Sequence, residues 1–313
     1  MPRTLVKTTD ITHEQWLEYR RTGLGGSDAA AVLGLNPYKS KIELWADKTG
    51  RISNVEDNIA MRVGRELEDC VARCFCEETG KKVRRRNAIF QHDYHDFITA
   101  NVDREIVGEN AGLECKTTSP LAKSDFENGE IPLYYYCQCV HYMNVMGYDR
   151  MYLAVLVIGK KLYWFTIERN EEECESLLSA EIAFWNDFIK PDVRPDPDGS
   201  ESAERTIKAL CENWEDNAIA MFEQNDTAAE LASVMEQKKA LETREKLLKQ
   251  KLELALDGNS DGFTVDYKVT YRPQTRTTID SKRLKSELPD IYSKYLKSTE
   301  YRVFKLTERK DEA

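Results

Sequence analysis

Three residues that could catalyse phosphoryl chemistry lie close together in TANVDREIVGENAGLECKTTSP, positions 99–120. Asp103 is followed eleven positions later by Glu114, and Lys116 comes two positions after that. Alternate residues of a strand share a face, so Glu114 and Lys116 project together while Cys115 points the other way into packing. Asp103, at the end of the neighbouring strand, can reach the same point. Two carboxylates near the carbonyl of Cys115 suit Mg²⁺, which takes a few protein oxygens together with waters and substrate phosphate. Lys116 could then orient or activate a water for attack on phosphorus.

Acid-x-lysine triplets are weak evidence by themselves, and this chain has several. They begin at Glu114, Glu236, Asp266, Asp280 and Glu308. Only the first combines a predicted core strand, a preceding strand that ends in Asp103, and a glycine turn between the two. The alternative interpretation of the first triplet is an ion pair across strands at the sheet edge.

A second acidic group occurs in GRELEDC, where Glu66, Glu68 and Asp69 crowd one turn of a predicted helix. Most acidic helix turns are solvated surface. A helix that packs on the sheet could nevertheless direct one of these carboxylates at a nearby metal ion.

Arg20 and Ser27 flank the glycine-rich turn LGGSD. A helix that begins after these glycines, with Ser27 at its cap, offers free backbone N–H groups and a hydroxyl to an anion. An arginine nearby could hold a phosphate with two hydrogen bonds. Ordinary helix capping beside a surface arginine is the alternative.

Local patterns predict an α/β domain over residues 1–190, with a mixed sheet flanked by helices. A linker at 191–201 follows, since its three prolines oppose regular structure. The helices are expected at 12–23, 27–34, 41–50, 58–79, 132–147 and 171–189, and the strands at 81–91, 96–103, 111–118, 150–159 and 161–169.

Residues 202–313 form a predicted accessory region, which differs from the α/β domain in having a highly charged helical segment. Near-heptad spacing of apolar residues predicts a helical hairpin or a coiled coil; these residues are Leu231, Val234, Leu241, Leu248 and Leu252. A strand pair is expected within 262–273 and further helices within 280–296.

The composition describes a globular chain of 313 residues with 41% hydrophobic residues and a net charge of -10. That charge argues against a nucleic-acid packaging protein but not against a nuclease, because basic residues such as KKVRRR at 81–86 can be local. No apolar run approaches the ~20 residues of a membrane span. The N-terminus has no signal-peptide pattern, which predicts a cytoplasmic protein whose eight cysteines are mostly free thiols.

Four motifs in order resemble the YqaJ-type viral recombinases, relatives of bacteriophage lambda exonuclease in the PD-(D/E)xK nuclease superfamily. They are WLEYRRTGLGGSDAAAVLGLNPY, GRELE, NVD followed by ECK, and YYYCQCVHYM, all within residues 13–190. The resemblance implies the restriction-endonuclease-like core of that superfamily. It also implies a Mg²⁺-dependent enzyme, with Mn²⁺ as a possible substitute, that resects linear duplex DNA 5′ to 3′.

The resemblance also assigns roles to residues. It implies that Asp103, Glu114, the carbonyl of Cys115 and Glu68 hold metal, with Glu68 chosen over Glu66 because the family's glutamate follows a glycine by four positions. Lys116 would serve the catalytic water, and Gln138 would support the site. Arg20 and Ser27 match the positions that bind the 5′-phosphate of a DNA end. The implied partners are DNA ends, a single-strand annealing protein of the RecT or Red-beta type, and further copies of the chain in a trimeric ring.

Two alternatives remain at this stage. One is an iron-sulfur nuclease of the CRISPR-adaptation type, suggested by Cys70, Cys74 and Cys76, although only the widely separated Cys174 and Cys211 follow the nuclease core. The other is a non-catalytic scaffold that binds DNA ends. The intact set of Asp103, Glu114 and Lys116 argues against this scaffold, because a binding module does not need all three residues.

Overall fold

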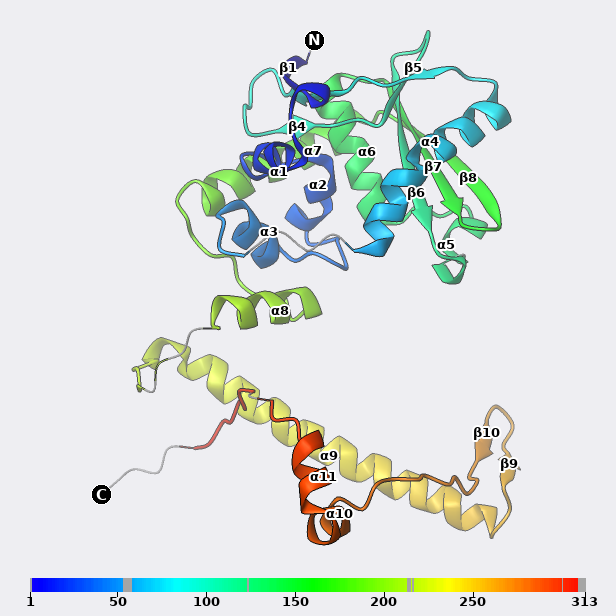
Figure 1. Cartoon of the computed structure of the whole chain (residues 1–313), viewed down its shortest axis with the longest axis vertical. Helices are drawn as coiled ribbons and strands as arrows, with labels where there is room; N and C mark the ends of the chain where they lie inside the picture. The colour runs from blue at the N-terminus through cyan, green and yellow to red at the C-terminus, as the bar shows by residue number, and fades with distance from the viewer. Residues whose placement is uncertain are drawn as a thin grey trace. The chain divides into compact units, whose positions relative to one another are not determined.

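A computed structural model describes residues 2–52, 58–122, 124–212, 215, 217–299 and 301–308. The chain forms two compact units, Met1–Glu215 and Asp216–Ala313 (Figure 1). Within the described residues, no helix combines the length and the apolar character needed to cross a membrane.

A five-stranded mixed sheet in the order β2-β5-β6-β7-β8 is the framework of unit 1. Its strands are β2 (Val83–Arg84), β5 (Arg104–Ile106), β6 (Ala111–Thr118), β7 (Arg150–Val157) and β8 (Lys161–Glu168). The β6 and β7 strands are parallel and the other neighbouring pairs are antiparallel. The predicted strand 111–118 and the hairpin at 150–169 are confirmed.

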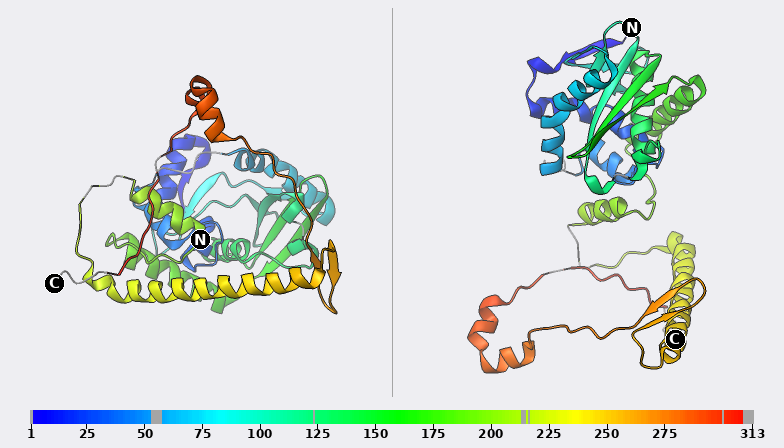
Figure 2. Two further views of the ribbon diagram at one scale, coloured as in Figure 1. Left: turned by 90° about the horizontal axis from the view of Figure 1, so that it is seen from below. Right: turned by 90° about the vertical axis from the view of Figure 1, so that its right-hand side faces the viewer.

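Helices cover both faces of this sheet. On one face lies α4 (Ile59–Thr79), whose Val71 and Phe75 pack against Leu113 and the ring of Tyr152. On the other face lie α6 (Leu133–Met146) and α7 (Glu171–Phe184), and a larger core forms there. The right-hand view of Figure 2 shows the strands between these two layers. The predicted α/β core with a mixed sheet between helices is therefore confirmed.

Local signals explain the limits of α4. The side chain of Asn58 accepts a hydrogen bond from the N–H of Met61 and caps the first turn. Gly80 ends the helix in the left-handed conformation, with φ of 71°, which glycine adopts without steric cost.

Unit 1 also contains a smaller sheet, β1-β3-β4, and the first three helices lie between β1 and β3 in the sequence. Its strands are β1 (Arg3–Lys7), β3 (Ala88–Gln91) and β4 (Thr99–Ala100), and the helices are α1 (His13–Arg21), α2 (Gly26–Val32) and α3 (Lys41–Lys48). The predictions of single strands at 81–91 and 96–103 are wrong. Residues 81–91 divide between the two sheets, at a break where Asn87 has a positive φ of 46°. Asp103 lies in the segment between β4 and β5.

The boundary of the first unit lies beyond the expected residue 190. A π-helical turn, Trp185–Ile189, is followed by an irregular segment in which Asp192 pairs with both nitrogens of the Arg51 guanidinium group. The helix α8 (Glu201–Leu210) then packs on α3, because the Ser202 hydroxyl accepts the Ser40 N–H at 2.8 Å and Ala203 enters the core. Residues 202–212, expected as part of the accessory region, thus belong to unit 1.

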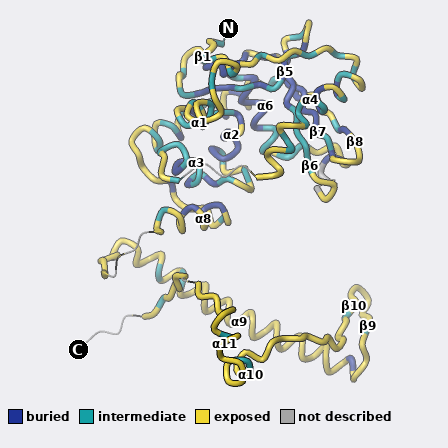
Figure 3. Tube along the Cα trace, in the orientation of Figure 1, coloured by how far each residue is buried: buried dark blue, intermediate teal, exposed yellow. Residues whose placement is uncertain are grey.

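The longest helix of the described part of unit 2 is α9, which runs without a break over Asn225–Leu256. The helical hairpin considered for this region is wrong, because neither glycine nor proline interrupts residues 225–256. The predicted strand pair is present as β9 (Asp261–Phe263) with β10 (Lys268–Thr270), and the later helices as α10 (Ser281–Glu287) and α11 (Pro289–Tyr295). Figure 3 shows that unit 2 is largely exposed, whereas unit 1 contains most of the buried residues.

The remaining short elements are 3-10 turns at Thr8–Asp10, Pro120–Ala122 and Phe222–Gln224, and the helix α5 (Ser124–Glu127).

Candidate active site

Glu114 is the most buried charged residue of the candidate site, with 3% of its side chain exposed. It projects from β6 towards α6, where one of its oxygens, Oε1, accepts a hydrogen bond from Gln138 Nε2 at 2.6 Å. The same oxygen lies 2.7 Å from Lys116 Nζ, so Glu114 and Lys116 share a face as predicted. The other oxygen, Oε2, is buried with no hydrogen-bond partner among the described residues. A buried carboxylate oxygen without a donor is costly, which makes it a candidate ligand for a cation.

Asp103 approaches Glu114 from the turn before β5. Its Oδ2 accepts the backbone N–H of Cys115 at 2.8 Å, which ties the aspartate to the strand that carries Glu114. Burial, followed by the negative charges of Glu114 and Glu68, raises the pKa of Asp103 well above its usual value. A site that concentrates negative charge in this way favours a bound cation.

Cys115 itself packs with the apolar side chains beneath α4, as its predicted orientation requires. Its backbone N–H, bound by Asp103, is a contact that the sequence did not suggest, since the resemblance singled out the carbonyl.

Glu68 does not join Asp103 and Glu114 directly. It lies on α4, and its Oε1 accepts a hydrogen bond from Arg104 Nη1 at 2.6 Å. The same Arg104 nitrogen donates to the carbonyl of Asp103 at 2.6 Å, and Nη2 donates to Asp69 at 2.5 Å. Arg104, only 5% exposed, therefore connects the acidic turn of α4 to the segment that carries Asp103.

The donor set fits a hard divalent cation that needs few protein ligands. In the described parts of the chain, no three His, Cys, Asp or Glu side chains are gathered closely enough to hold a metal without rearrangement, and the expected set that includes Glu68 stays a prediction. Arg104 binds the Glu68 carboxylate in this arrangement. Asp103 and the unpartnered oxygen of Glu114 remain, and Mg²⁺ is commonly held by one or two carboxylates with waters and phosphate.

Lys116 is held between acids and a ring. Burial alone would lower the pKa of Lys116, but the charges of Glu114 and Asp103 outweigh burial and raise it. The ammonium also lies 5.3 Å from the centre of the Tyr135 ring. The structure thus fixes a positive charge beside the two carboxylates.

Gln138 connects this group to the next one. Besides donating to Glu114, its Nε2 donates to the hydroxyl of Tyr142 at 2.9 Å, and Tyr142 donates to the carbonyl of Asn101 at 3.2 Å. A Cβ added to Gly26 would lie 2.6 Å from the Tyr142 ring, so only glycine permits α2 to approach α6 this closely. The start of α2 and Glu114 therefore both pack against α6, the former at Tyr142 and the latter at Gln138.

The structure brings Arg20 and Ser27 together. Arg20 Nη2 donates to the Ser27 hydroxyl at 2.6 Å, and its guanidinium carbon lies 4.8 Å from the centre of the Trp16 ring. Both Arg20 and Ser27 are exposed. The prediction that Ser27 caps α2 is wrong, because Gly25 occupies the cap position and the carboxylate of Asp28 accepts the Gly25 N–H at 3.1 Å.

Asp28 is the centre of a charge network that the sequence did not reveal. It is 1% exposed and lies 2.6 Å from Lys48 Nζ and 3.2 Å from Lys39 Nζ. Burial alone would raise the pKa of Asp28, but the charges of Lys39, Lys48 and Arg20 outweigh burial and hold it well below its usual value. Lys48 also donates to the carbonyl of Arg20 at 2.6 Å. The network therefore fixes the backbone on which Arg20 and Ser27 stand.

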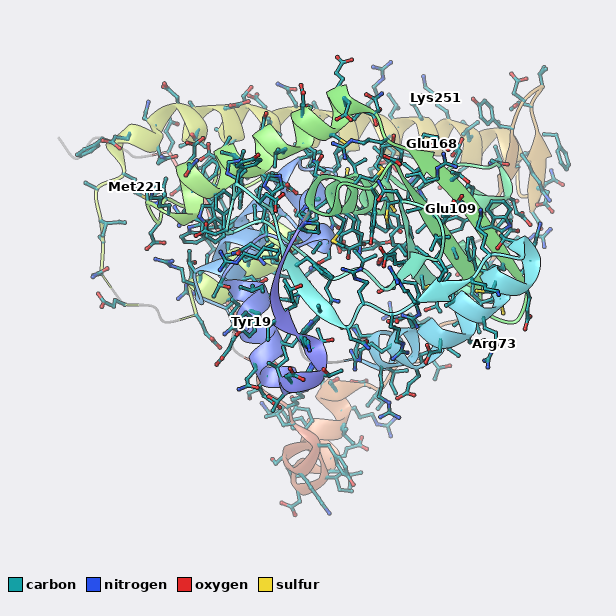
Figure 4. The ribbon with its side chains drawn as sticks, turned by 90° about the horizontal axis from the view of Figure 1, so that it is seen from above. Tyr19, Arg73, Glu109, Glu168, Met221 and Lys251 are labelled. Carbon is teal, nitrogen blue, oxygen red and sulfur yellow. The ribbon has the colours of Figure 1, made fainter. Side chains whose placement is uncertain are left out.

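An open polar hollow of about 180 Å³ lies beside Asp103. Its walls include Trp16, Asn101, Asp103, Glu68 and Arg85. Trp16 lies on α1 and Glu68 on α4, the helices that Tyr19 and Arg73 mark in Figure 4. Part of the basic run at 81–86 reaches the site here, since Arg85 pairs with Asp69 at 2.5 Å.

The three cysteines that suggested an iron-sulfur cluster lie apart from the two cysteines that follow the nuclease core. Cys70, Cys74 and Cys76 belong to α4, whereas Cys174 is buried on α7 across the sheet and Cys211 is exposed after α8. This arrangement does not favour the iron-sulfur alternative.

The sequence is similar to one family of known proteins. Residues 15–149 match the YqaJ-like viral recombinase domain. The uncharacterized protein YqaJ of Bacillus subtilis (strain 168) is 40% identical over 309 residues, which cover 97% of each chain.

Two solved structures are similar to this chain. The crystal structure of an alkaline exonuclease from Laribacter hongkongensis aligns with a TM-score of 0.50 and 18% identity, over 63% of this chain and 100% of that one. A phage-related exonuclease from Haemophilus somnus 129PT aligns with a TM-score of 0.43 and 14% identity, over 54% and 96% of the two chains. The likeness to the Laribacter structure supports the predicted fold, a central mixed sheet flanked by helices. With 40% identity to the Bacillus protein over almost its whole length, the chain belongs to the YqaJ-like viral recombinase family.

Proposed function

We propose that this protein is a Mg²⁺-dependent DNA exonuclease that degrades one strand of linear duplex DNA from its 5′ end. The observation that carries the proposal is the buried, unpartnered Oε2 of Glu114 beside Asp103 and Lys116. Membership of a viral recombinase family and the fold shared with an alkaline exonuclease support the proposal.

Asp103 and Glu114 would hold the cation, with the carbonyl of Cys115 assisting and Glu68 as a further carboxylate near the site. Mg²⁺, or Mn²⁺ in its place, would supply polarisation of the scissile phosphate and stabilisation of the leaving oxygen. Lys116 orients the attacking water, and Gln138 holds Glu114 in position through its 2.6 Å hydrogen bond.

The reaction is hydrolysis of one phosphodiester bond. The oxygen of water bonds to phosphorus, the bond from phosphorus to the 3′ oxygen of the terminal nucleotide breaks, and that oxygen leaves with a proton. The phosphate stays on the shortened strand, so each cycle creates a new 5′-phosphate. Arg20 and Ser27, which lie 2.6 Å apart on an exposed surface, would bind that phosphate through charge-assisted hydrogen bonds.

The biological partners belong to the same proposal. Resection from the 5′ end leaves a 3′ single strand, the substrate of a single-strand annealing protein. A trimeric ring would keep the enzyme on its DNA, and a cytoplasmic location would give it access to DNA in a bacterial host. The accessory unit, with its exposed α9, is the candidate surface for the annealing protein or for oligomer contacts.

The test is nucleotide release from 5′-phosphorylated linear duplex DNA in Mg²⁺. We expect the wild type to release mononucleotides and Lys116→Ala to be slower by about a thousandfold, since it removes a charge placed at the reacting phosphate. Lys160→Ala, in the exposed turn between β7 and β8, is the matched control and should keep full activity.

Two results would overturn the proposal. They are an inactive wild type, and a Lys116→Ala variant as fast as wild type. Cleavage of closed circular DNA would replace the exonuclease with an endonuclease.

A further inference from the structure

One exposed and two half-buried tyrosines form an aromatic cluster next to Lys116, and none of them has a role in the proposed hydrolysis. We call Tyr38, Tyr134 and Tyr135 the aromatic platform. Tyr38 is 68% exposed, and its ring meets Tyr134 edge to face with centroids 5.7 Å apart. The rings of Tyr134 and Tyr135 are 4.3 Å apart, and Tyr135 lies under the Lys116 ammonium. The platform therefore reaches the candidate active site through Lys116.

Helix geometry places the platform on the same wall as the acidic group. Residues four apart on a helix share a face, so Tyr134, Gln138 and Tyr142 form one row along α6. Gln138 and Tyr142 in this row are the residues that contact Glu114 and Asn101. Tyr134 thus lies one helical turn from the glutamine that holds Glu114.

Tyr38 stands on a backbone that is held in place. The side chain of Asn36 accepts the N–H groups of Tyr38 and Lys39, at 2.9 and 3.2 Å. Lys39 in turn pairs with the buried Asp28 and with Asp47. A ring on such a fixed turn loses little conformational freedom when a ligand stacks on it.

A tyrosine cluster with one exposed ring and a cation beside it suits an occupant that is flat, apolar on its faces and attached to an anionic chain. Leu35 and Leu133, the neighbours of the platform in sequence, are also exposed, at 42% and 56%. Nucleobases of a single strand stack on aromatic side chains, and a nearby lysine attracts the phosphate between them. The cation at Lys116 distinguishes this surface from a purely apolar docking site.

We propose that the aromatic platform is a base-stacking subsite that holds an unpaired nucleobase of the strand being cleaved, next to the scissile phosphate. This inference rests on the proposed function, because it takes Lys116 as the position of that phosphate. The subsite tolerates all four bases, since stacking uses the ring face and not the hydrogen-bonding edge.

The test is binding of a 5′-phosphorylated single-stranded oligonucleotide that carries 2-aminopurine at its second nucleotide, in EDTA so that no hydrolysis occurs. Stacking on a ring quenches 2-aminopurine fluorescence. We expect quenching by wild type, and loss of quenching with about tenfold weaker binding for the double variant Tyr38→Leu/Tyr134→Leu. The matched variant Tyr38→Phe/Tyr134→Phe keeps both rings and should behave as wild type. Tyr94→Leu, a change at an 88% exposed tyrosine in the turn after β3, controls for loss of any surface ring.

The outcomes separate this inference from the proposed function. Equal affinity and equal quenching in the leucine and phenylalanine double variants would overturn the platform, even if Mg²⁺-dependent nucleotide release is normal. Loss of quenching in the leucine variant alone supports the platform, even if the wild type releases no nucleotides.

Discussion

The acidic group around Glu114 and the Asp28 network are both buried charge clusters in unit 1, but their charges are balanced differently. Asp28 has two lysines within 3.2 Å and a pKa held low. Glu114 shares one oxygen with Lys116 and Gln138, while its other oxygen has no partner among the described residues and the pKa of nearby Asp103 is raised. The Asp28 network is complete within the protein, whereas the Glu114 group leaves one buried carboxylate oxygen unpaired among the described residues. Buried charge therefore maintains structure in one place and, in the proposed function, provides a cation site in the other.

The largest effect is expected from Glu114→Gln, which keeps the shape of the side chain and removes its charge. Nuclease activity should fall by about a thousandfold. Stability should stay equal or rise, because a buried, incompletely paired charge beside Asp103 is removed. Nucleotide release and thermal unfolding of the same preparation measure both. A variant that retains activity but unfolds at lower temperature would reverse the comparison.

Asp28→Asn should show the opposite behaviour, since it leaves Lys48 buried without its partner. We expect a loss of about 3 kcal/mol of unfolding free energy, measured by urea denaturation at neutral pH. The folded pKa of Asp28 is depressed, so its contribution is present above the ordinary pKa of ~3.9 and is lost as pH falls through the lower folded value. The difference from wild type should therefore be constant between pH 8 and pH 5. A difference that disappears in that range would contradict the assignment.

Arg20→Ala should affect the DNA end more than the chemistry. Removal of a charge-assisted hydrogen-bond donor should reduce the preference for phosphorylated over hydroxyl 5′ ends by about 10- to 100-fold. Competition between the two substrates measures the ratio. An unchanged ratio would remove Arg20 from phosphate recognition, whatever the total activity.

The smallest effect concerns His141, which is fully buried with its Nδ1 at 2.6 Å from Glu181 and its Nε2 at 2.8 Å from the carbonyl of Thr99. Burial would lower the pKa of His141, but the charge of Glu181 outweighs burial and raises the pKa overall. The hydrogen bonds to Glu181 and to the Thr99 carbonyl, and the charge of Asp28, also favour the protonated ring. A raised folded pKa stabilises below the ordinary value of ~6.5, and this contribution is lost as pH rises through the folded pKa.

The melting-temperature difference between wild type and His141→Gln should accordingly be larger at pH 6 than at pH 9. Burial, followed by the charge of His95 and then that of His141, lowers the pKa of His92, so His92→Gln is the control for a second titrating ring. A difference that grows with pH would show that the ring is neutral in the folded protein.

The sequence predicted the parts of the fold whose signals are local. Asn58 and Gly80 mark the limits of α4, and alternation around Gly159 marks the β7 and β8 hairpin. The break between β2 and β3 was missed because a run of basic residues carries no period, and the left-handed Asn87 is visible only in the backbone.

The sequence predicted the part of the candidate site whose residues lie close together in one short motif. Glu114 and Lys116 follow from strand periodicity. Arg104 and the Asp28 network were missed, because their partners lie on other elements and acids and bases of this kind usually mark the surface. One signal was present, since Asp28 begins an otherwise apolar helix, SDAAAVLG. An isolated acid in such a setting indicates a buried partner.

Mn²⁺ binding, followed by electron paramagnetic resonance, tests the central claim most directly. The ion can replace Mg²⁺ at oxygen sites and its free signal is lost on binding. We expect wild type and Asp28→Asn to bind Mn²⁺ at the same site, and Glu114→Gln and Asp103→Asn to lose it. Binding that survives in Glu114→Gln, or its absence from wild type, would contradict the assignment of the acidic group as a metal centre.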